Sequence, residues 1–308
     1  MKDIRLGLVG LGKIARDQHL PAIAATNGID LVAVASRNAT AQSVNNYPDL
    51  TAMLAGEPDL DAIVLCQPPQ ARYAAALIAL AAGKHVFLEK PPGATVSEAQ
   101  ALGALAAEQR VTLFASWHSR YAAAVATAKG WVAANAPRRV RIDWKEDVRH
   151  WHPGQEWIWE PGGFGVFDPG INALSILTEV IGVPVRLVDA DLDKPANRQT
   201  PIAARLMLET ANGVPIHAEF DWRQTGPQTW DIMVETGGKS LILSDGGNRL
   251  TIDGIPQSIE HEAEYPGLYR RFVDLVRARQ SDIDLAPLQI VADAFLRGRW
   301  HSTEAFVD

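Results

Sequence analysis

The N-terminal part of the chain alternates short apolar runs, rich in β-branched residues, with alanine-rich stretches of helical length. The apolar runs lack the polar alternation of a half-exposed strand, so both faces of each strand are expected to be buried. A parallel sheet covered by helices on both faces satisfies such runs. The expected strands are 4–9, 31–35, 62–66, 85–88 and 112–115, and the expected helices are 13–25, 49–55, 71–82 and 96–109.

The rest of the chain has a different character. All nine tryptophans lie at Trp117 or beyond, and Ala136-Pro137 is interpreted as a link between domains. Alternating runs separated by glycine turns predict an antiparallel meander. At roughly 150 residues per domain, 308 residues predict two domains. The expected strands are 140–144, 203–209, 215–222, 229–235, 240–243 and 249–252, and the expected helices are 122–134, 170–181, 265–279 and 288–301.

The first expected strand runs directly into Gly10-Leu11-Gly12-Lys13-Ile14-Ala15 and then into a helix. This is the pattern G-x-G-x-x-A in its required strand–turn–helix context. Gly10 permits a tight turn, Gly12 lets the backbone approach a pyrophosphate, and Ala15 allows close packing of helix on strand. The helix N-terminus presents free N–H groups to the phosphates. The pattern predicts dinucleotide binding; the alternative is a glycine-rich turn without a ligand.

The end of the second strand should contact the ribose of the adenosine half. An acidic residue there would hold the 2′-hydroxyl of NAD, but this chain has Ser36-Arg37-Asn38. A hydroxyl beside a guanidinium suits a 2′-phosphate, because arginine offers fixed, charge-assisted donors. We therefore expect NADP to be accepted alongside NAD. The alternative is a solvated loop arginine at position 37.

Glu89-Lys90-Pro91-Pro92 follows the fourth strand. Ligands of open parallel sheets bind beyond the carboxyl ends of the strands, which is where Lys90 lies. An ammonium there could stabilise the oxyanion that develops as a hydroxyl loses its proton. His118 follows the fifth strand in the same way and could bind substrate or carry the proton outward. The alternatives are a surface lysine at a strand end and a histidine that only lines the domain junction.

Composition excludes several classes of protein. The net charge is 29 − 36 = −7 with no basic run, which argues against nucleic acid and anionic membranes. No apolar stretch is long enough to span a membrane, and no targeting segment is evident, which favours the cytoplasm. The single cysteine, Cys66, cannot form an internal disulfide. No metal is expected, because Asp147, His150 and His152 match no established ligand spacing.

At several places the chain resembles the Gfo/Idh/MocA family of dehydrogenases. The resemblance is carried by the glycine loop 10–15, by Gly83-Lys84-His85-Val86, by Glu89-Lys90-Pro91, and by Val291-Ala292-Asp293-Ala294-Phe295 near the end. The segments 144–155, 157–163 and 167–175 are similar to the bacterial D-galactose/L-arabinose 1-dehydrogenase branch. The middle block is long and specific, whereas the glycine motif alone would not be.

The resemblance implies an α/β protein with two domains. An N-terminal Rossmann domain with a doubly wound parallel sheet would cover 1–120 and bind the dinucleotide. A C-terminal α/β domain with an open, mostly antiparallel sheet would cover 121–308, bind substrate and form a homo-oligomer, dimer or tetramer, through that sheet. The site would lie between the domains, with the nicotinamide near Lys90. The expected cofactor contacts are Gly10, Gly12, Lys13, Ile14, Ser36, Arg37, Glu89 and Lys90.

Asp168 and Asn172 are four residues apart at the start of an expected helix, so both can point to one face. Many family members have histidine where this chain has Asn172, and that histidine is credited as the acid/base. Asparagine does not titrate usefully, so proton transfer should fall to Asp168, to Lys90 or to the pair. The alternative reading of Asp168 is an ordinary residue of a helix N-terminus.

Sugar hydroxyls bind carboxylates and imidazoles, and indoles pack on the apolar face of a pyranose. The expected substrate contacts are therefore Glu146, Trp151, His152, Asp168, Asn172 and Trp230. Trp230 could equally belong to the core. Packing in the core is the simpler interpretation of the remaining indoles of this region, Trp144, Trp157, Trp159 and Trp222.

The resemblance implies oxidation of the C1 hydroxyl of D-galactose or L-arabinose to a 1,5-lactone, with hydride transfer to NAD(P). The catalytic residues would be Lys90, Asp168 and His118. One alternative is a relative that oxidises another polyol or cyclitol. Another is a dinucleotide-binding regulator without catalysis, which the presence of both Lys90 and Asp168 disfavours, because a sensor needs no proton acceptor. The sequence does not rank the two sugars.

Overall fold

The computed structural model of the chain describes residues 2–260 and 264–307. The chain forms two compact units. One comprises Met1–His118 and Glu264–Asp284, and the other comprises Ser119–Ala263 and Leu285–Asp308. The chain therefore leaves the first unit, returns to it, and leaves it again.

The first unit is built on a six-stranded sheet in which every pairing is parallel, in the order β3-β2-β1-β4-β5-β6. This order is that of a doubly wound dinucleotide-binding sheet, which confirms the predicted Rossmann fold. The strands are β1 (Ile4–Val9), β2 (Ile29–Ala35), β3 (Asn45–Tyr47), β4 (Ala62–Leu65), β5 (His85–Glu89) and β6 (Leu113–Ser116).

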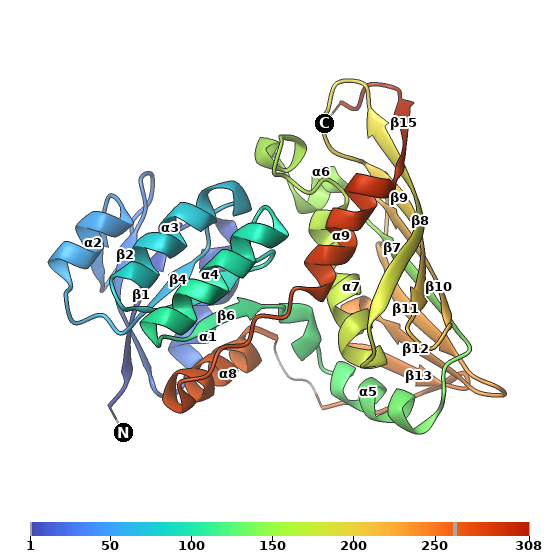
Figure 1. The fold of residues 1–308 in the computed structure, drawn as a ribbon, viewed down its shortest axis with the longest axis horizontal. Helices are drawn as coiled ribbons and strands as arrows, with labels where there is room; N and C mark the ends of the chain where they lie inside the picture. The colour runs from blue at the N-terminus through green and yellow to red at the C-terminus, as the bar shows by residue number, and fades with distance from the viewer. Residues whose placement is uncertain (1, 261–263, 308) are drawn as a thin grey trace. The chain divides into compact units, whose positions relative to one another are not determined.

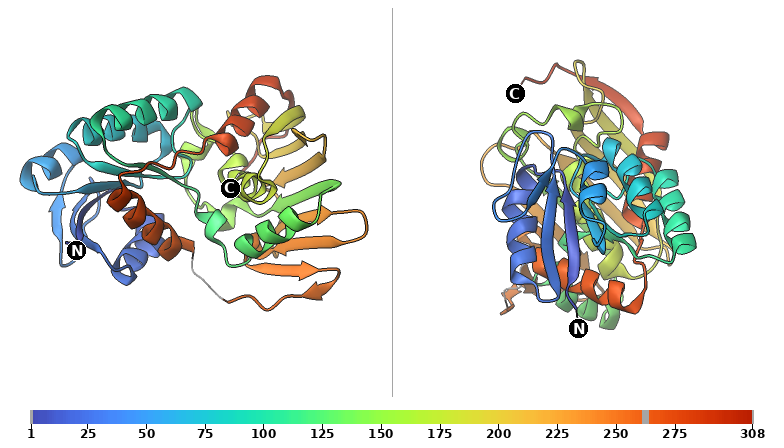
Figure 2. Two further views of the ribbon diagram at one scale, coloured as in Figure 1. Left: turned by 60° about the horizontal axis from the view of Figure 1, so that its bottom comes forward. Right: turned by 90° about the vertical axis from the view of Figure 1, so that its left-hand side faces the viewer.

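Helices cover both faces of this sheet. They are η1 (Ala15–His19), α1 (Leu20–Ala25), α2 (Leu50–Gly56), α3 (Pro69–Ala81), α4 (Val96–Gln109) and α8 (Glu264–Ala278), and the short turn η2 (His118–Tyr121) follows the last strand. Figures 1 and 2 show α3 and α4 together on one face, with α1 and α8 on the other. Local signals fix the starts of two helices. Asp49 caps α2 through the amide of Ala52, and Thr95 with Glu98 forms a capping box on α4.

Helix α8 belongs to the first unit, whereas the sequence prediction placed the whole of 121–308 in the second domain. Its apolar face carries the aromatic rings that explain the difference. Tyr269 stacks on Phe87 of β5 with ring centres 5.1 Å apart, and Phe272 meets the same ring edge-on at 5.5 Å. An amphipathic pattern shows that a helix covers a sheet, but it does not say which sheet it covers.

The second unit contains a nine-stranded sheet in the order β14-β13-β12-β11-β7-β10-β9-β8-β15. Two pairings, β7 with β10 and β8 with β15, are parallel and the others are antiparallel, so the predicted mostly antiparallel sheet is confirmed. The strands are β7 (Arg139–Lys145), β8 (Val185–Pro195), β9 (Ala203–Thr210), β10 (Pro215–Asp221), β11 (Thr229–Glu235), β12 (Ser240–Ser244), β13 (Arg249–Ile252), β14 (Ile255–Pro256) and β15 (Arg299–Thr303).

One face of the nine-stranded sheet packs against helices, as Figure 1 shows. In β7 the side chains of Val140, Ile142 and Trp144 are buried, and those between them point to the polar outer face. The covering helices are α5 (Val125–Ala134), α7 (Phe167–Ile181) and α9 (Ala286–Arg297); the shorter elements are α6 (Val148–Trp151), η3 (Glu156–Trp159) and η4 (Asp245–Gly247).

The C-terminal helix is shorter than predicted. The expected helix 288–301 ends at Arg297, because Gly298 is extended and the next residues pair with β8 as the edge strand β15. The expectation for 299–301 was therefore wrong. Strand β8 was not predicted at all, since Asp189 and Asp191 interrupt its apolar pattern. In the structure Arg299 pairs with both carboxylates across the strands.

Candidate active site

The glycine loop has the geometry that its sequence predicts. Gly10 adopts φ +94°, and a Cβ there would lie 3.0 Å from the amide nitrogen of Gln67. Gly12 is different, because a Cβ on it would meet no protein atom within 4 Å. Packing within the protein therefore does not require glycine at position 12. The uncovered backbone at this turn fits the close approach of a pyrophosphate to the start of the following helix.

The other predicted contacts of the dinucleotide lie nearby in the first unit. Lys13 forms an exposed ion pair with Asp17, and Ile14 is partly exposed. At the end of β2, the amide of Ser36 donates to the Tyr47 carbonyl at 2.9 Å, which fixes the backbone before Arg37. The Arg37 side chain is exposed.

Lys90 lies at the end of β5 in a turn held by a buried arginine. Arg72 Nη1 donates to the carbonyl oxygens of Glu89, at 2.5 Å, and of Pro91, and Nη2 donates to the Gln67 carbonyl. The Lys90–Pro91 peptide is cis. One guanidinium therefore fixes the backbone on both sides of the lysine, so the ammonium projects from a defined point at the carboxyl edge of the sheet.

Glu89, a predicted cofactor contact, turns inward. Its carboxylate is 3% exposed, and it accepts from Tyr265 Oη at 2.6 Å, from Ser116 Oγ at 3.1 Å and from the Lys90 amide. His19 Nε2 lies 3.7 Å from the same carboxylate. The carboxylate is thus engaged by protein groups, and its evident effect is to hold the turn that carries Lys90.

The pKa values of Glu89 and His19 in this buried cluster are strongly shifted. Burial opposes ionisation of Glu89, but the adjacent His19, with smaller effects from His118 and the Tyr265 hydroxyl, outweighs it and holds the pKa of that carboxyl far below its ordinary value. Burial also disfavours the charged form of His19, yet the neighbouring Cys66 and Glu89 raise the pKa of His19 to about 10. The favoured state is therefore an imidazolium facing a carboxylate.

His118, predicted to be catalytic, is partly exposed at the end of the same sheet. Its Nδ1 lies 2.5 Å from Glu264 Oε2, and its ring stacks on Tyr265 with centres 5.3 Å apart. The carboxylate and the ring together fix the orientation of the imidazole.

In the second unit, Glu146 follows β7 and is buried. Two indole N–H groups donate to it: Trp222 Nε1 to Oε1 at 3.1 Å, and Trp230 Nε1 to Oε2 at 2.8 Å. Trp222 was interpreted as a core residue, and it is fully buried, but it also orients this carboxylate. The structure therefore brings Glu146 and Trp230, both predicted substrate contacts, into direct contact.

The predicted residue His152 lies between Glu146 and a second predicted residue, Asp168. His152 Nε2 is 3.4 Å from Glu146 Oε1, and its Nδ1 is 3.7 Å from Asp168 Oδ2. Asp168 is buried in the first turn of α7, and the half-buried Asn172 follows one turn later on that helix. The second unit thus brings together two buried carboxylates and an imidazole.

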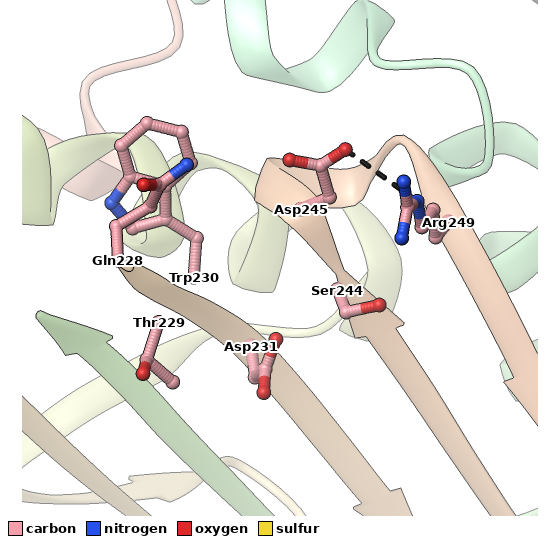
Figure 3. Close-up of a pocket in the computed structure, with 7 residues that line it drawn as sticks. All are labelled: Gln228, Thr229, Trp230, Asp231, Ser244, Asp245 and Arg249. Carbon is pink, nitrogen blue, oxygen red and sulfur yellow. Dashed lines mark ion pairs between the residues drawn. The ribbon is translucent and has the colours of Figure 1, made fainter. Parts of the chain in front are cut away.

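Indole rings surround this cluster. Trp230 stacks on Trp144 with ring centres 5.9 Å apart and tilts toward Trp151 at 5.0 Å. Trp151 is 37% exposed. Trp230 also lines a neighbouring cavity of about 280 Å³ with Gln228, Asp231 and Arg249. Figure 3 shows Trp230 on one side of β11 and Asp231 on the other, as strand alternation requires.

Sequence reasoning missed the residues that support the predicted ones. Arg72, His19 and Tyr265 were not singled out. A lone cation in the apolar helix 71–82 was an available signal for Arg72, whereas His19 and Tyr265 sit in ordinary amphipathic patterns. Among residues 2–260 and 264–307, no group of three His, Cys, Asp or Glu side chains could hold a metal ion, and no helix is long and apolar enough to cross a membrane.

Comparison with known proteins places these features in a family. The sequence model of Gfo/Idh/MocA, described as an oxidoreductase family with an NAD-binding Rossmann fold, matches residues 4–116. Galactose 1-dehydrogenase from Pseudomonas fluorescens is 45% identical over 308 residues, which span 100% of both chains.

Solved structures agree with this assignment. The crystal structure of a D-galactose-1-dehydrogenase protein from Rhizobium etli has a TM-score of 0.96 and 56% identity, covering 100% of this chain and 99% of that one. A 3-ketoreductase from Actinomadura kijaniata, in complex with NADP and TDP-benzene, has a TM-score of 0.87 at 18% identity, covering 98% of this chain and 100% of that one; it shows the fold alone. The chain belongs to the Gfo/Idh/MocA family of oxidoreductases.

Proposed function

We propose that the protein is an aldose 1-dehydrogenase. It oxidises the anomeric C1 hydroxyl of D-galactose, L-arabinose or both to the 1,5-lactone and reduces NAD(P). The observation that carries this proposal is the cluster in the second unit. Buried Glu146 and Asp168 flank His152 there, and the indole of Trp230 donates to Glu146. Acceptors, a donor and aromatic faces together suit a pyranose. The full-length similarity to proteins named galactose 1-dehydrogenase supports the same substrate.

The residues present fit a nicotinamide dinucleotide, because the uncovered backbone at Gly12 leaves the phosphate approach open. We assign Gly10, Gly12, Lys13 and Ile14 to the pyrophosphate and Ser36 with Arg37 to the adenosine ribose. A guanidinium there favours a 2′-phosphate, so NADP should be used as well as NAD. When bound, the nicotinamide accepts the hydride from C1. Glu89 acts by holding the Lys90 turn.

Asp168 takes the proton of the C1 hydroxyl in our proposal. Its neighbour Asn172 donates to another sugar hydroxyl, and Lys90 from the first unit stabilises the developing oxyanion. Glu146 binds a hydroxyl, and Trp151 and Trp230 face the apolar side of the ring. D-galactose and L-arabinose share configuration at C2, C3 and C4, so one set of contacts can serve both. A contact to the axial C4 hydroxyl would reject D-glucose.

The outer face of the nine-stranded sheet is polar. It carries paired charges, among them Lys145 with Glu219 at 2.7 Å and Arg223 with Asp221 at 2.8 Å. We propose that this face joins copies of the chain into a dimer or tetramer, and that the protein works in the cytoplasm. The mass of the native particle measured by light scattering tests the assembly.

The decisive experiment incubates the enzyme with NAD or NADP and each of D-galactose, L-arabinose, D-glucose and myo-inositol. We expect absorbance of the reduced nicotinamide with the first two sugars and little with D-glucose. Reduction with myo-inositol alone would favour the second candidate, a polyol or cyclitol dehydrogenase of the same family. Binding of cofactor without turnover of any substrate would favour a regulator.

A further inference from the structure

The imidazole of His152 lies between two buried carboxylates. Nε2 is 3.4 Å from Glu146 Oε1, and Nδ1 is 3.7 Å from Asp168 Oδ2. The ring keeps 16% of its side-chain surface exposed, whereas the side chains of Glu146 and Asp168 are 3% and 6% exposed. His152 is therefore the member of this trio with access to solvent.

The position of Glu146 favours one tautomer of this ring. Glu146 already accepts from the indoles of Trp222 and Trp230, which fix it as an ionised acceptor. Nε2 faces the Glu146 carboxylate at 3.4 Å, so in the neutral ring the proton is favoured on Nε2, and Nδ1 then faces Asp168 without a proton. Nδ1 is a buried atom without a hydrogen-bond partner among the described residues. The arrangement, a carboxylate orienting an imidazole whose other nitrogen faces a proton-transfer site, is that of a general-base relay.

We propose that His152 carries the substrate proton from Asp168 to solvent. This inference rests on the proposed function. As the electron pair of the C1–H bond leaves with hydrogen to the nicotinamide, the C1–O bond becomes a carbonyl and the hydroxyl proton moves to Asp168. That proton then passes to Nδ1 of His152, Glu146 stabilises the imidazolium, and the imidazolium releases one proton to water. Asp168 returns to its ionised form for the next turnover.

Among the described residues, the only charged groups in contact with His152 are the carboxylates of Glu146 and Asp168. Glu146 comes from the end of β7 and Asp168 from α7, while the ring of Trp222, 5.2 Å away, brings no charge. On the preceding helix α6, Arg149 pairs with Asp147 at 3.4 Å. The two carboxylates therefore set the electrostatic surroundings of His152.

The test compares His152→Gln with His150→Gln, the same change on an exposed histidine two residues away. Glutamine can still donate a hydrogen bond to Glu146, but its amide neither takes up nor releases a proton at neutral pH. We expect kcat of His152→Gln to fall by about 100-fold, with loss of the histidine-dependent limb of the pH profile. His150→Gln should keep the kcat of the wild type. A residue that only binds a sugar hydroxyl would instead raise KM and leave kcat in place.

His152→Ala provides a second, independent readout, because added imidazole can occupy the vacated space. We expect millimolar imidazole to restore part of its kcat and to leave His150→Ala unaffected. A raised KM with unchanged kcat and pH profile, or no response to imidazole, overturns the relay while the proposed function stands. If the wild type turns over no aldose, both the proposed function and the relay fail.

Discussion

At the scale of single residues, the most consequential feature of the first unit is the buried pair of His19 and Glu89. Both side chains are almost fully buried, with His19 Nε2 3.7 Å from the carboxylate. Removing one member of such a pair leaves an uncompensated buried charge, which is strongly destabilising. Because Glu89 also accepts from the Lys90 amide, the pair supports the turn that carries the proposed catalytic lysine.

The His19 pair predicts a pH-dependent stability. The pKa of His19 is raised from 6.5 to about 10, so its contribution is complete below pH 6.5 and is lost as pH rises through 10. The lowered pKa of Glu89 makes its contribution complete above pH 4.5 and lost at more acidic pH. In urea unfolding, His19→Gln should be less stable than wild type by roughly 3–5 kcal/mol near pH 5.5. The difference should shrink by pH 9, and a constant difference would contradict the account.

Arg37 carries a separate prediction about cofactor choice. Arg37→Ala should lower kcat/KM with NADP relative to NAD by roughly tenfold or more, because a charge-assisted contact to the 2′-phosphate is lost. The control is Arg186→Ala, which removes an exposed arginine paired with Glu209 in the second unit. An unchanged cofactor ratio in Arg37→Ala would show that Arg37 is only a solvated loop residue.

The sequence could identify residues whose position alone implies chemistry. Gly10 and Lys90 stand where strands end, and Asp168 stands in the first turn of a helix. The sequence could not identify the residues that hold these groups in place. Arg72 and Tyr265 come close to the Lys90 turn only in the folded chain, and no sequence spacing marks them. Trp222 shows the limit most clearly: it was interpreted as core, and its second role depends on an N–H group that only the fold aims at Glu146.

At the scale of elements, helix α7 positions both Asp168 and Asn172, and its packing leaves no room at Gly170. A Cβ on Gly170 would lie 2.8 Å from Cδ1 of the buried Phe220 of β10. This contact explains why a glycine stands inside a helix, where it normally costs stability. Close approach of α7 to the sheet therefore sets where the two site residues lie.

Gly170→Ala should destabilise the protein by about 1–3 kcal/mol and lower kcat/KM, because the ring or the helix must shift. Gly130→Ala is the matched control, since a Cβ at that position of α5 would meet nothing within 4 Å. The control should gain about 0.5–1 kcal/mol. Urea unfolding of both variants measures the two changes, and equal effects would refute the packing argument.

Elements with strong periodicity were predictable. Strand β1 and helix α4 have the predicted bounds, because continuous apolar runs and a capping box mark them clearly. Strands β8 and β15 escaped prediction because their ladder is held partly by the ion pairs of Arg299 with Asp189 and Asp191, which look like a solvated surface in sequence. The order of strands in both sheets follows from packing between distant segments and has no local signal.

At the scale of the whole molecule, the proposed reaction uses residues of both units. Lys90 belongs to the first and Asp168 to the second. Each unit supports its own residue: the first through Arg72 and Glu89, the second through Glu146 and His152. Our central claim is that this ammonium and this carboxylate act on one sugar hydroxyl. When two residues act as a unit, removing both lowers kcat far less than their two separate effects combined would.

A double-mutant cycle on turnover of D-galactose tests this claim most directly. Lys90→Ala and Asp168→Ala should each lower kcat by about 100-fold or more. The double variant should be no more than a few-fold slower than the slower single variant, because both losses affect the same proton. Near-normal kcat in either single variant, or losses that multiply fully in the double variant, would contradict the account.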